Sequence, residues 1–328
     1  MGHVTIIAEA GVNHNGSLKR AFDMVDAAKD CGVDYIKFQT FKSSNLVTKN
    51  APLAQYQKNS VNVNNQEAML RSLELSFLDF KKLKDYCKTI DLGFLSTPFD
   101  LESLDYLESL NLPLYKIGSG DLNNAPLLLK LNSFKKDVIL STGMATLDEI
   151  QESLDLLDKC KVSLLHCTTQ YPCPYTAVNM LSLKTLKDRF NLDVGYSDHT
   201  VGLEIAFMAV AMGASIIEKH FTLDKKLQGP DHKASLDVAE LKNLVQGIRH
   251  IELAFGSCQK TLQECEINNK AIARKSLVAA CAIKKGEIFT KDNITSKRPG
   301  TGLSPMLYTK ILGMVSKKDF IKDDLIEI

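Results

Sequence analysis

The feature that most constrains the fold is an eightfold alternation of short apolar runs with amphipathic stretches. Runs of this length bounded by turn residues are typical of buried strands, and the stretches between them are typical of helices. Eight strand–helix units in about 255 residues match a (β/α)₈ TIM barrel in number and size. We therefore predict this α/β fold; the alternative, a doubly wound sheet, rarely reaches eight regular units. The runs lie at 5–11, 35–40, 93–98, 115–120, 137–143, 162–169, 192–200 and 215–222.

Three of the intervening stretches carry clear helix signals. Residues 17–32 place apolar side chains on one stripe and end on Gly32. Residues 146–160 begin with Thr146 and Glu149, which have the spacing of a capping box. A third helix is expected at 237–256, after the last run.

The pattern changes after Gly256. Residues 257–270 are polar and read as a linker, whereas 271–328 hold short β-type segments and turn signals without a long helical stripe. We predict a barrel domain at 1–256 and a small β-rich domain at 271–328. A domain of that size has a marginal core, so we expect it to dock on the barrel or on a partner chain.

The composition excludes several classes of function. Forty basic and 39 acidic residues leave a net charge of +1, which gives no electrostatic footprint for nucleic acid or an acidic membrane surface. No apolar run approaches the roughly 18 residues that span a bilayer. The run at 4–11 is too short for a signal sequence and contains Glu9. We expect a cytoplasmic protein whose eight cysteines, with no CxxC pair, are reduced.

Polar residues recur at the C-terminal ends of the predicted strands. Residues i and i+2 of a strand share a face, and TIM-barrel enzymes build their active sites at this rim. Isolated charges on a buried face cost several kcal/mol, so their presence on at least four runs predicts one shared polar pocket. The polar residues at these strand ends are Glu9, the pair Lys37 and Gln39, the pair Ser197 and His199, and the pair Glu218 and His220.

The residue types in this pocket indicate two kinds of ligand. Two ammonium groups, several hydroxyls and glycine-lined turns suit a small molecule with a phosphate and a carboxylate. Two imidazoles near carboxylates suit a divalent transition metal, which would act as a Lewis acid on a carbonyl. The anion-binding candidates are Lys37, Thr97, Lys116, Ser119, Ser141 and Ser197, and the metal candidates are His199 and His220. The long polar stretch 42–65 suggests a lid or binding loop.

Ten motifs, in order along nearly the whole chain, resemble the sialic acid synthase family, which includes N-acetylneuraminate and legionaminate synthases. They are "AEAGVNHNGS", "KFQTF", "STPFD", "KIGSGD", "STGMAT", "HCTTQYPCPY", "GYSDHT", "EKHFT", "GPDHKAS" and "KRPGTG". The resemblance implies a TIM barrel followed by an antifreeze-like SAF domain, a domain-swapped homodimer, and condensation of phosphoenolpyruvate with an N-acetylmannosamine-type sugar to form a nonulosonate and phosphate.

The resemblance also implies roles for single residues. It assigns the six anion-binding candidates to phosphoenolpyruvate, and His199 and His220 to a metal, most often Mn²⁺ with Mg²⁺ or Co²⁺ as alternatives. Glu9 and Glu218 match carboxylates near the metal and the reacting carbons. The residues implied to contact the sugar are Gln39, Asp121, Thr169, Tyr171, Asp231 and, from the partner subunit's small domain, Arg298.

Two departures bear on the sugar. Asp121 stands where the family more often has Glu, and Thr169 stands where neuraminate synthases usually have Asn. Thr169 and the motifs "GPDHKAS" and "AEAGVNHNG" look more like the legionaminate branch, whose sugar would be 2,4-diacetamido-2,4,6-trideoxymannose. The sequence leaves both sugars open.

Two readings from other classes compete with this one. A metal-dependent hydrolase on a barrel would favour an H-x-H pair on the first strand, which "AEAGVNHNG" lacks. A glycan- or ice-binding protein with an inactive barrel would have no need of the complete set of strand-end polar groups.

Overall fold

The computed structural model describes residues 2–49, 51–52 and 65–328, and the chain divides into two compact units, residues 1–256 and 257–328. Each unit has its own apolar core.

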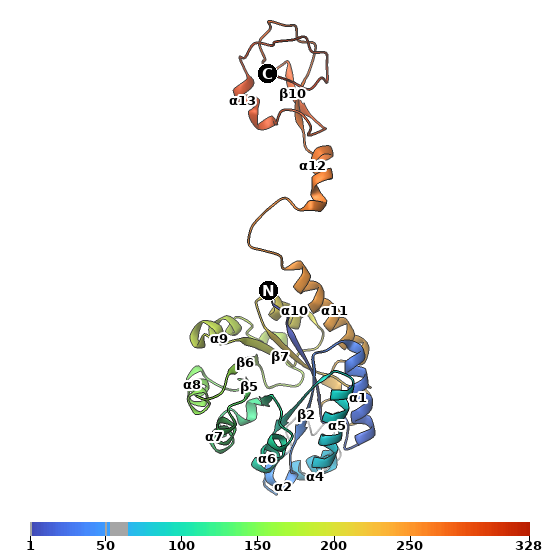
Figure 1. The fold of residues 1–328 in the computed structure, drawn as a ribbon, viewed down its shortest axis with the longest axis vertical. Helices are drawn as coiled ribbons and strands as arrows, with labels where there is room; N and C mark the ends of the chain where they lie inside the picture. Colours follow the sequence, from blue (N-terminus) through green and yellow to red (C-terminus); the bar gives the residue numbers. More distant parts are fainter. Residues whose placement is uncertain (1, 50, 53–64) are drawn as a thin grey trace. The chain divides into compact units, whose positions relative to one another are not determined.

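The first unit is a parallel eight-stranded sheet in the order β3-β2-β1-β8-β7-β6-β5-β4, and β3 and β4 pack together at its two ends. The predicted (β/α)₈ barrel is thereby confirmed (Figure 1). The strands are β1 (Thr5–Gly11), β2 (Tyr35–Thr40), β3 (Gly93–Pro98), β4 (Leu114–Ile117), β5 (Asp137–Ser141), β6 (Val162–Cys167), β7 (Val194–Asp198) and β8 (Ile216–His220).

Five of the predicted strands end earlier in the structure than the sequence predicted. For example, β4 stops at Ile117, and the run's last residues instead enter a short 3₁₀ turn at Ser119–Asp121. At these positions the chain leaves the sheet and forms the rim of the barrel, where serine, glycine and threonine are common. The apolar part of each run is therefore a strand, whereas its polar end belongs to the loop that follows.

Helices surround the strands (Figure 1). They are α1 (Leu18–Cys31), α2 (Ser43–Leu46), α4 (Gln66–Leu73), α5 (Phe77–Thr89), α6 (Leu101–Ser109), α7 (Ala125–Phe134), α8 (Leu147–Leu156), α9 (Ser182–Phe190), α10 (Glu204–Ala211) and α11 (Val238–Ala254).

The predicted helix signals are confirmed at α1 and at the start of α8. Gly32 ends α1 with φ of 81°, a left-handed conformation that glycine adopts without steric cost. Thr146 and Glu149 form the capping box of α8, but this helix ends at Leu156, so the predicted end at residue 160 was wrong. The third predicted helix is α11.

The barrel interior has an apolar layer below the rim. It consists of side chains from five strands: Ile7, Leu95, Ile139, Leu165 and Ile216. The alternation of a strand then brings Glu9, Thr97, Ser141, Cys167 and Glu218, each two residues further on, to the same side one layer higher. We call the apolar layer the apolar plug and the layer of these five side chains above it the polar floor.

The second unit contains an antiparallel pair of strands, β9 (Ser276–Ala279) and β10 (Ile294–Lys297), and further isolated bridges. Its β-rich character is as predicted, but α12 (Ile267–Ala273) runs across the predicted border at residue 270, where a linker was expected to end. A second short helix, α13 (Tyr308–Ile311), follows. Residues 257–263 contain no helix or strand.

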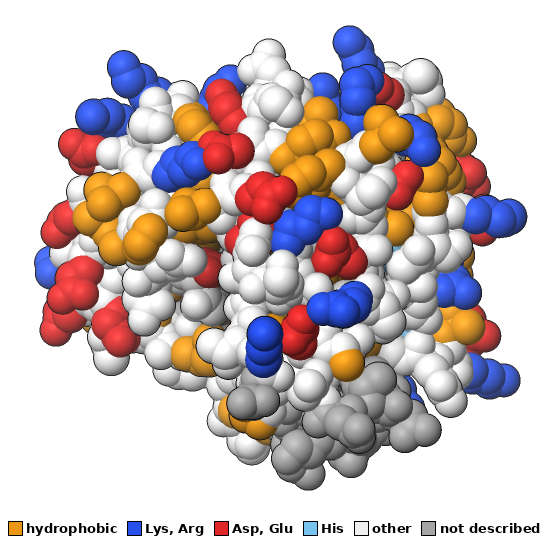
Figure 2. All heavy atoms as spheres, turned by 90° about the horizontal axis from the view of Figure 1, so that it is seen from below, with side chains coloured by type: hydrophobic (Ala, Val, Ile, Leu, Met, Phe, Trp, Pro, Cys, Tyr) orange, Lys and Arg blue, Asp and Glu red, His pale blue; other side chains and the backbone are white. Residues whose placement is uncertain are grey.

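The face shown in Figure 2 carries basic and acidic side chains interspersed, without a large field of one sign. Across the described part of the chain, no helix combines the length and apolar character needed to cross a membrane. All eight cysteines are free in the structure.

Candidate active site

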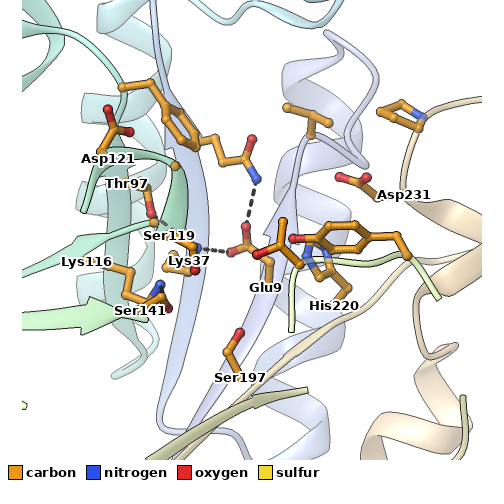
Figure 3. A pocket seen from close by; sticks show the side chains of 18 of the residues that line it. Glu9, Lys37, Thr97, Lys116, Ser119, Asp121, Ser141, Ser197, His220 and Asp231 are labelled. Carbon is orange, nitrogen blue, oxygen red and sulfur yellow. Dashed lines mark hydrogen bonds and ion pairs between the residues drawn. The ribbon is translucent and has the colours of Figure 1, made fainter. Parts of the chain in front are cut away.

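The polar floor and the rim loops enclose a pocket of about 490 Å³. Every predicted site residue of the barrel lines it, and ten of them are labelled in Figure 3: Glu9, Lys37, Thr97, Lys116, Ser119, Asp121, Ser141, Ser197, His220 and Asp231. The others are Gln39, Thr169, Tyr171, His199 and Glu218. Arg298 is exposed and belongs to the second unit, directly after β10.

Two lysines and two glutamates form a buried charge network on the floor. Lys37 Nζ lies 2.6 Å from Glu9 Oε2 and 3.7 Å from Glu218 Oε2. Lys116 Nζ lies 3.5 Å from Glu218 Oε1. The four side chains are at most 7% exposed, so their charges balance inside the protein rather than in solvent.

Hydroxyl groups surround this network. Lys37 Nζ donates to Thr97 Oγ1 at 3.2 Å, and Lys116 Nζ donates to Ser141 Oγ at 2.7 Å. Ser197 Oγ donates to Glu218 Oε1 at 3.0 Å. Each ammonium therefore has a hydroxyl beside it, an arrangement that can hold phosphate or carboxylate oxygens.

The two carboxyl groups of the network differ in acidity. Burial raises the pKa of Glu218, but Lys116 and Lys37 outweigh burial and bring this pKa to about 2. Burial keeps the pKa of Glu9 above its usual value, because Lys37 offsets only part of it and Glu218 adds to it. The surroundings thus favour the ionised form of Glu218 more strongly than that of Glu9.

The two histidines come from the ends of β7 and β8, and their ring centroids are 5.7 Å apart. His199 Nδ1 lies 2.8 Å from the carbonyl oxygen of Thr168, so Nδ1 carries the proton and donates it, leaving Nε2 with a lone pair. Burial lowers the pKa of both imidazoles. His220 Nδ1 is buried without a hydrogen-bond partner among the described residues.

These observations fit a divalent cation bound by two neutral imidazoles. Among the described residues, no cluster of three or more His, Cys, Asp or Glu side chains is arranged to hold a metal. With two protein ligands only, a cation held by His199 and His220 would have positions open for water or substrate, as catalytic metals require.

Asp231 lies close to Glu9 and Gln39 at the pocket wall. A Cβ added at Gly11, where φ is 53°, would lie 3.3 Å from Glu9 Oε1 and Gln39 Nε2 and 3.7 Å from Asp231 Oδ2. Glycine thus leaves room for the three side chains to converge. Burial and the neighbouring Glu9 raise the pKa of Asp231 to about 7.

This raised pKa predicts a pH-dependent cost in stability. Between the ordinary pKa near 3.8 and about 7, the folded state keeps the Asp231 proton while the unfolded state loses it, so stability falls as pH rises. We expect Asp231→Asn to unfold like the wild type near pH 4 and to be more stable by up to about 4 kcal/mol near pH 8.

Urea unfolding from pH 4 to 8 measures this difference, with the exposed Asp193→Asn as the control. A constant difference between Asp231→Asn and the wild type over this range would contradict the assignment.

One side of the pocket is apolar and was not predicted from the sequence. Seven apolar side chains line it from α2, from α4 and from the segments that follow β1, α2 and β3. We call them the apolar wall: Val12, Leu46, Val47, Met69, Leu70, Leu73 and Phe99. No strand-end pattern points to them; the only signal was the apolar stripe of α4. The predicted lid at 42–65 begins with α2, and residues 50 and 53–64 lie outside the described residues.

A cysteine also escaped prediction as a site residue. Cys167 lines the pocket, and its Sγ lies 3.1 Å from Ser119 Oγ. Thr169 Oγ1 is buried without a hydrogen-bond partner in the described part of the structure. A Cβ at Gly143 would come within 2.4 Å of this hydroxyl, so glycine keeps this side of the pocket open.

Comparisons with known proteins agree with this architecture. The NeuB family model matches residues 24–260, and the SAF domain model matches residues 274–327. The N,N'-diacetyllegionaminic acid synthase of Campylobacter jejuni subsp. jejuni is 49% identical and is aligned over 99% of each chain. The enzyme of the same name from Legionella pneumophila is 44% identical over 94% of this chain and 89% of its own length.

A solved structure shows the same likeness. The crystal structure of N-acetylneuraminic acid (sialic acid) synthetase from Leptospira borgpetersenii, in complex with citrate, is 34% identical. It superposes with a TM-score of 0.73, covering 82% of this chain and 90% of the other. With a family model matched over most of the barrel and relatives aligned over nearly their full length, this chain belongs to the NeuB family.

Proposed function

We propose that this protein is a nonulosonate synthase, which condenses phosphoenolpyruvate with N-acetylmannosamine or a related 2-acetamido sugar and releases phosphate. The observation that carries the proposal is the shared pocket, in which two lysines and their hydroxyl partners lie beside two neutral histidines. The 49% identity to a diacetyllegionaminic acid synthase supports 2,4-diacetamido-2,4,6-trideoxymannose as the alternative sugar.

Phosphoenolpyruvate would occupy the polar floor. Lys37 and Lys116 would bind its phosphate and carboxylate, assisted by Thr97, Ser119, Ser141 and Ser197. Because two glutamates already neutralise the two ammoniums, a further cation is needed to offset the anionic substrate.

That cation would be Mn²⁺, or Mg²⁺ or Co²⁺, held by His199 and His220. When bound, it supplies Lewis acidity toward the aldehyde oxygen of the open-chain sugar. The Thr168 carbonyl fixes the His199 ring for this purpose.

The remaining steps follow from charge. C3 of phosphoenolpyruvate attacks C1 of the aldehyde. The C1–O double bond opens, its oxygen takes up a proton to become a hydroxyl, and the new carbon–carbon bond leaves positive charge at C2. Glu9 would take a proton from the water that adds to C2 and pass it to the sugar's C1 oxygen. The raised pKa of Glu9 and the hydrogen bond of 2.9 Å from Gln39 Nε2 to its Oε1 support this role. The tetrahedral intermediate then loses phosphate by cleavage of the C2–O bond. Glu218 stays ionised and stabilises the cationic carbon and the lysines.

The other pocket residues would position the sugar. Gln39, Asp121, Thr169, Tyr171 and Asp231 all line the same pocket as Glu9 and the histidines. We further propose that the protein acts in the cytoplasm as a domain-swapped homodimer, in which Arg298 of one chain binds the sugar's N-acetyl group in the partner's barrel.

Phosphate release tests the function. Purified protein with Mn²⁺, phosphoenolpyruvate and a panel of amino sugars should release phosphate and form a nonulosonate only when both substrates are present. Hydrolysis of phosphoenolpyruvate without a sugar would favour a metal-dependent hydrolase. Absence of turnover with tight sugar binding would favour a binding protein with an inactive barrel.

A lysine variant separates the two substrates. Lys116→Met keeps the apolar stem but deletes a charge-assisted contact to the anion, which is worth about 1.5–3 kcal/mol. We expect the KM for phosphoenolpyruvate to rise about 10- to 100-fold and the KM for the sugar to change little. Steady-state kinetics with each substrate varied in turn check this, with exposed Lys159→Met as the control. An equal rise in both constants would refute the assignment of Lys116 to phosphoenolpyruvate.

A further inference from the structure

The pocket has two chemically different sides. The floor carries the charged groups, whereas the apolar wall is formed by aliphatic side chains and the ring of Phe99. Three members of the wall, Leu46, Val47 and Phe99, are partly exposed and pack on a buried cluster of Val12, Phe41, Met69, Leu70 and Leu73. The wall is therefore continuous with a small core of its own.

Polar contacts outside the pocket hold the wall in place. Glu74, at the end of α4, accepts from the backbone N–H of Ser43 at 2.9 Å and from Lys42 Nζ at 3.0 Å. The backbone N–H of Lys42 donates to Asp100 Oδ2 at 2.8 Å. These contacts tie the start of α2 to the end of α4 and to the start of α6, so polar contacts of the protein itself fix the position of the wall.

Neither phosphoenolpyruvate nor the aldehyde end of the sugar needs such a surface. Both carry oxygens that the lysines, hydroxyls and histidines of the floor can satisfy. The part of the ligand left to meet the wall is the end of the sugar remote from the aldehyde. A hydroxyl there would lose its water without gaining a hydrogen bond, whereas a methyl group would gain from burial.

We infer that the apolar wall is the specificity determinant of this enzyme and selects a sugar whose remote end carries a C6 methyl and an acetamido methyl rather than hydroxyls. Gln66, the first residue of α4, also lines the pocket and supplies an amide next to the wall, as an acetamido group requires. This inference rests on the proposed function and assigns the choice between the two candidate sugars to α2, α4 and Phe99.

The test compares sugars that differ at one atom. Phosphate release is measured with 2,4-diacetamido-2,4,6-trideoxymannose and with its 6-hydroxy counterpart. An apolar site discriminates against an added hydroxyl by roughly 10- to 100-fold in kcat/KM, so the wild type should prefer the 6-deoxy sugar by that factor.

Two variants then place a polar group in the wall. Val47→Thr is nearly isosteric and adds one hydroxyl, and Leu46→Asn replaces a side chain of similar size. In both, the preference for the 6-deoxy sugar should fall about 10-fold or more, while the KM for phosphoenolpyruvate stays as in the wild type. The matched control is Leu129→Asn, which alters an exposed leucine of α7 outside the pocket and should leave the preference unchanged.

The outcomes separate the two proposals. If the wild type releases phosphate with both sugars at equal efficiency, or if the wall variants keep the wild-type preference, the wall is not the determinant although the enzyme is a synthase. If no amino sugar supports phosphate release, the proposed function fails and the wall inference fails with it. An unchanged KM for phosphoenolpyruvate shows that a variant is folded.

Discussion

Replacement of His199 or His220 by alanine is expected to lower kcat/KM for the condensation by about a thousand-fold or more. Each variant loses one of the two imidazoles proposed to hold the cation, and the loss of Lewis acidity costs several kcal/mol, with each 1.36 kcal/mol worth a factor of ten in rate. The barrel should remain folded, because both side chains lie at the rim above the apolar plug.

Phosphate release before and after chelation, with Mn²⁺ added back, measures the effect. The wild type should lose activity with a chelator and regain it with Mn²⁺, whereas neither variant should respond. His250→Ala, at an exposed position of α11, is the control and should behave like the wild type. Full activity of either pocket variant after chelation would exclude the metal role.

Restoration of activity by mixing two inactive proteins is the second large effect that we expect. Arg298→Ala removes the proposed contact of the small domain, and His199→Ala removes a proposed metal ligand of the barrel. In a domain-swapped dimer of one chain of each kind, one site carries both changes and the other carries neither. Equal amounts that exchange freely should regain about a quarter of the wild-type activity, since half of the dimers are mixed and each has one intact site.

The alternative geometry gives a different result. If Arg298 serves the barrel of its own chain, every site in the mixture carries one change and activity stays absent. The experiment requires subunit exchange, which a size or affinity tag on one variant verifies. Arginine is expected at this position because its planar fork can hold an amide carbonyl in a fixed orientation. No recovery despite verified exchange would leave Arg298 as a surface residue of a Pro-Gly turn.

The barrel and its polar floor could be predicted from the sequence because both follow from strand periodicity. Ile7 and Glu9 differ by two positions, so an apolar core residue and a rim residue share one face, and the same relation holds for Ile139 and Ser141. The same rule predicted the two histidines, because His199 lies two positions after Ser197 and His220 lies two positions after Glu218.

The apolar wall could not be found in this way. Leu46 and Met69 lie on short helices in the long segment after β2, and Val47 directly follows one of them, so no strand pattern fixes their direction. Their apolar character was consistent with ordinary core packing, and only the tertiary contacts place them beside the charged floor. The early end of β4 was missed for a related reason, since polar rim residues continue an apolar run without a break in the sequence.

The buried polar atoms without partners have a practical consequence. Thr169 Oγ1 and His220 Nδ1 have no hydrogen-bond partner among the described residues, so a ligand can bond to them without breaking a contact within the protein. A ligand that satisfies them binds only the folded state and adds about 2.7 kcal/mol at a hundred times its Kd. For a barrel of this size that corresponds to roughly 5 °C in Tm. Thermal melting in the presence of single substrates and metals can therefore rank candidate sugars without any turnover.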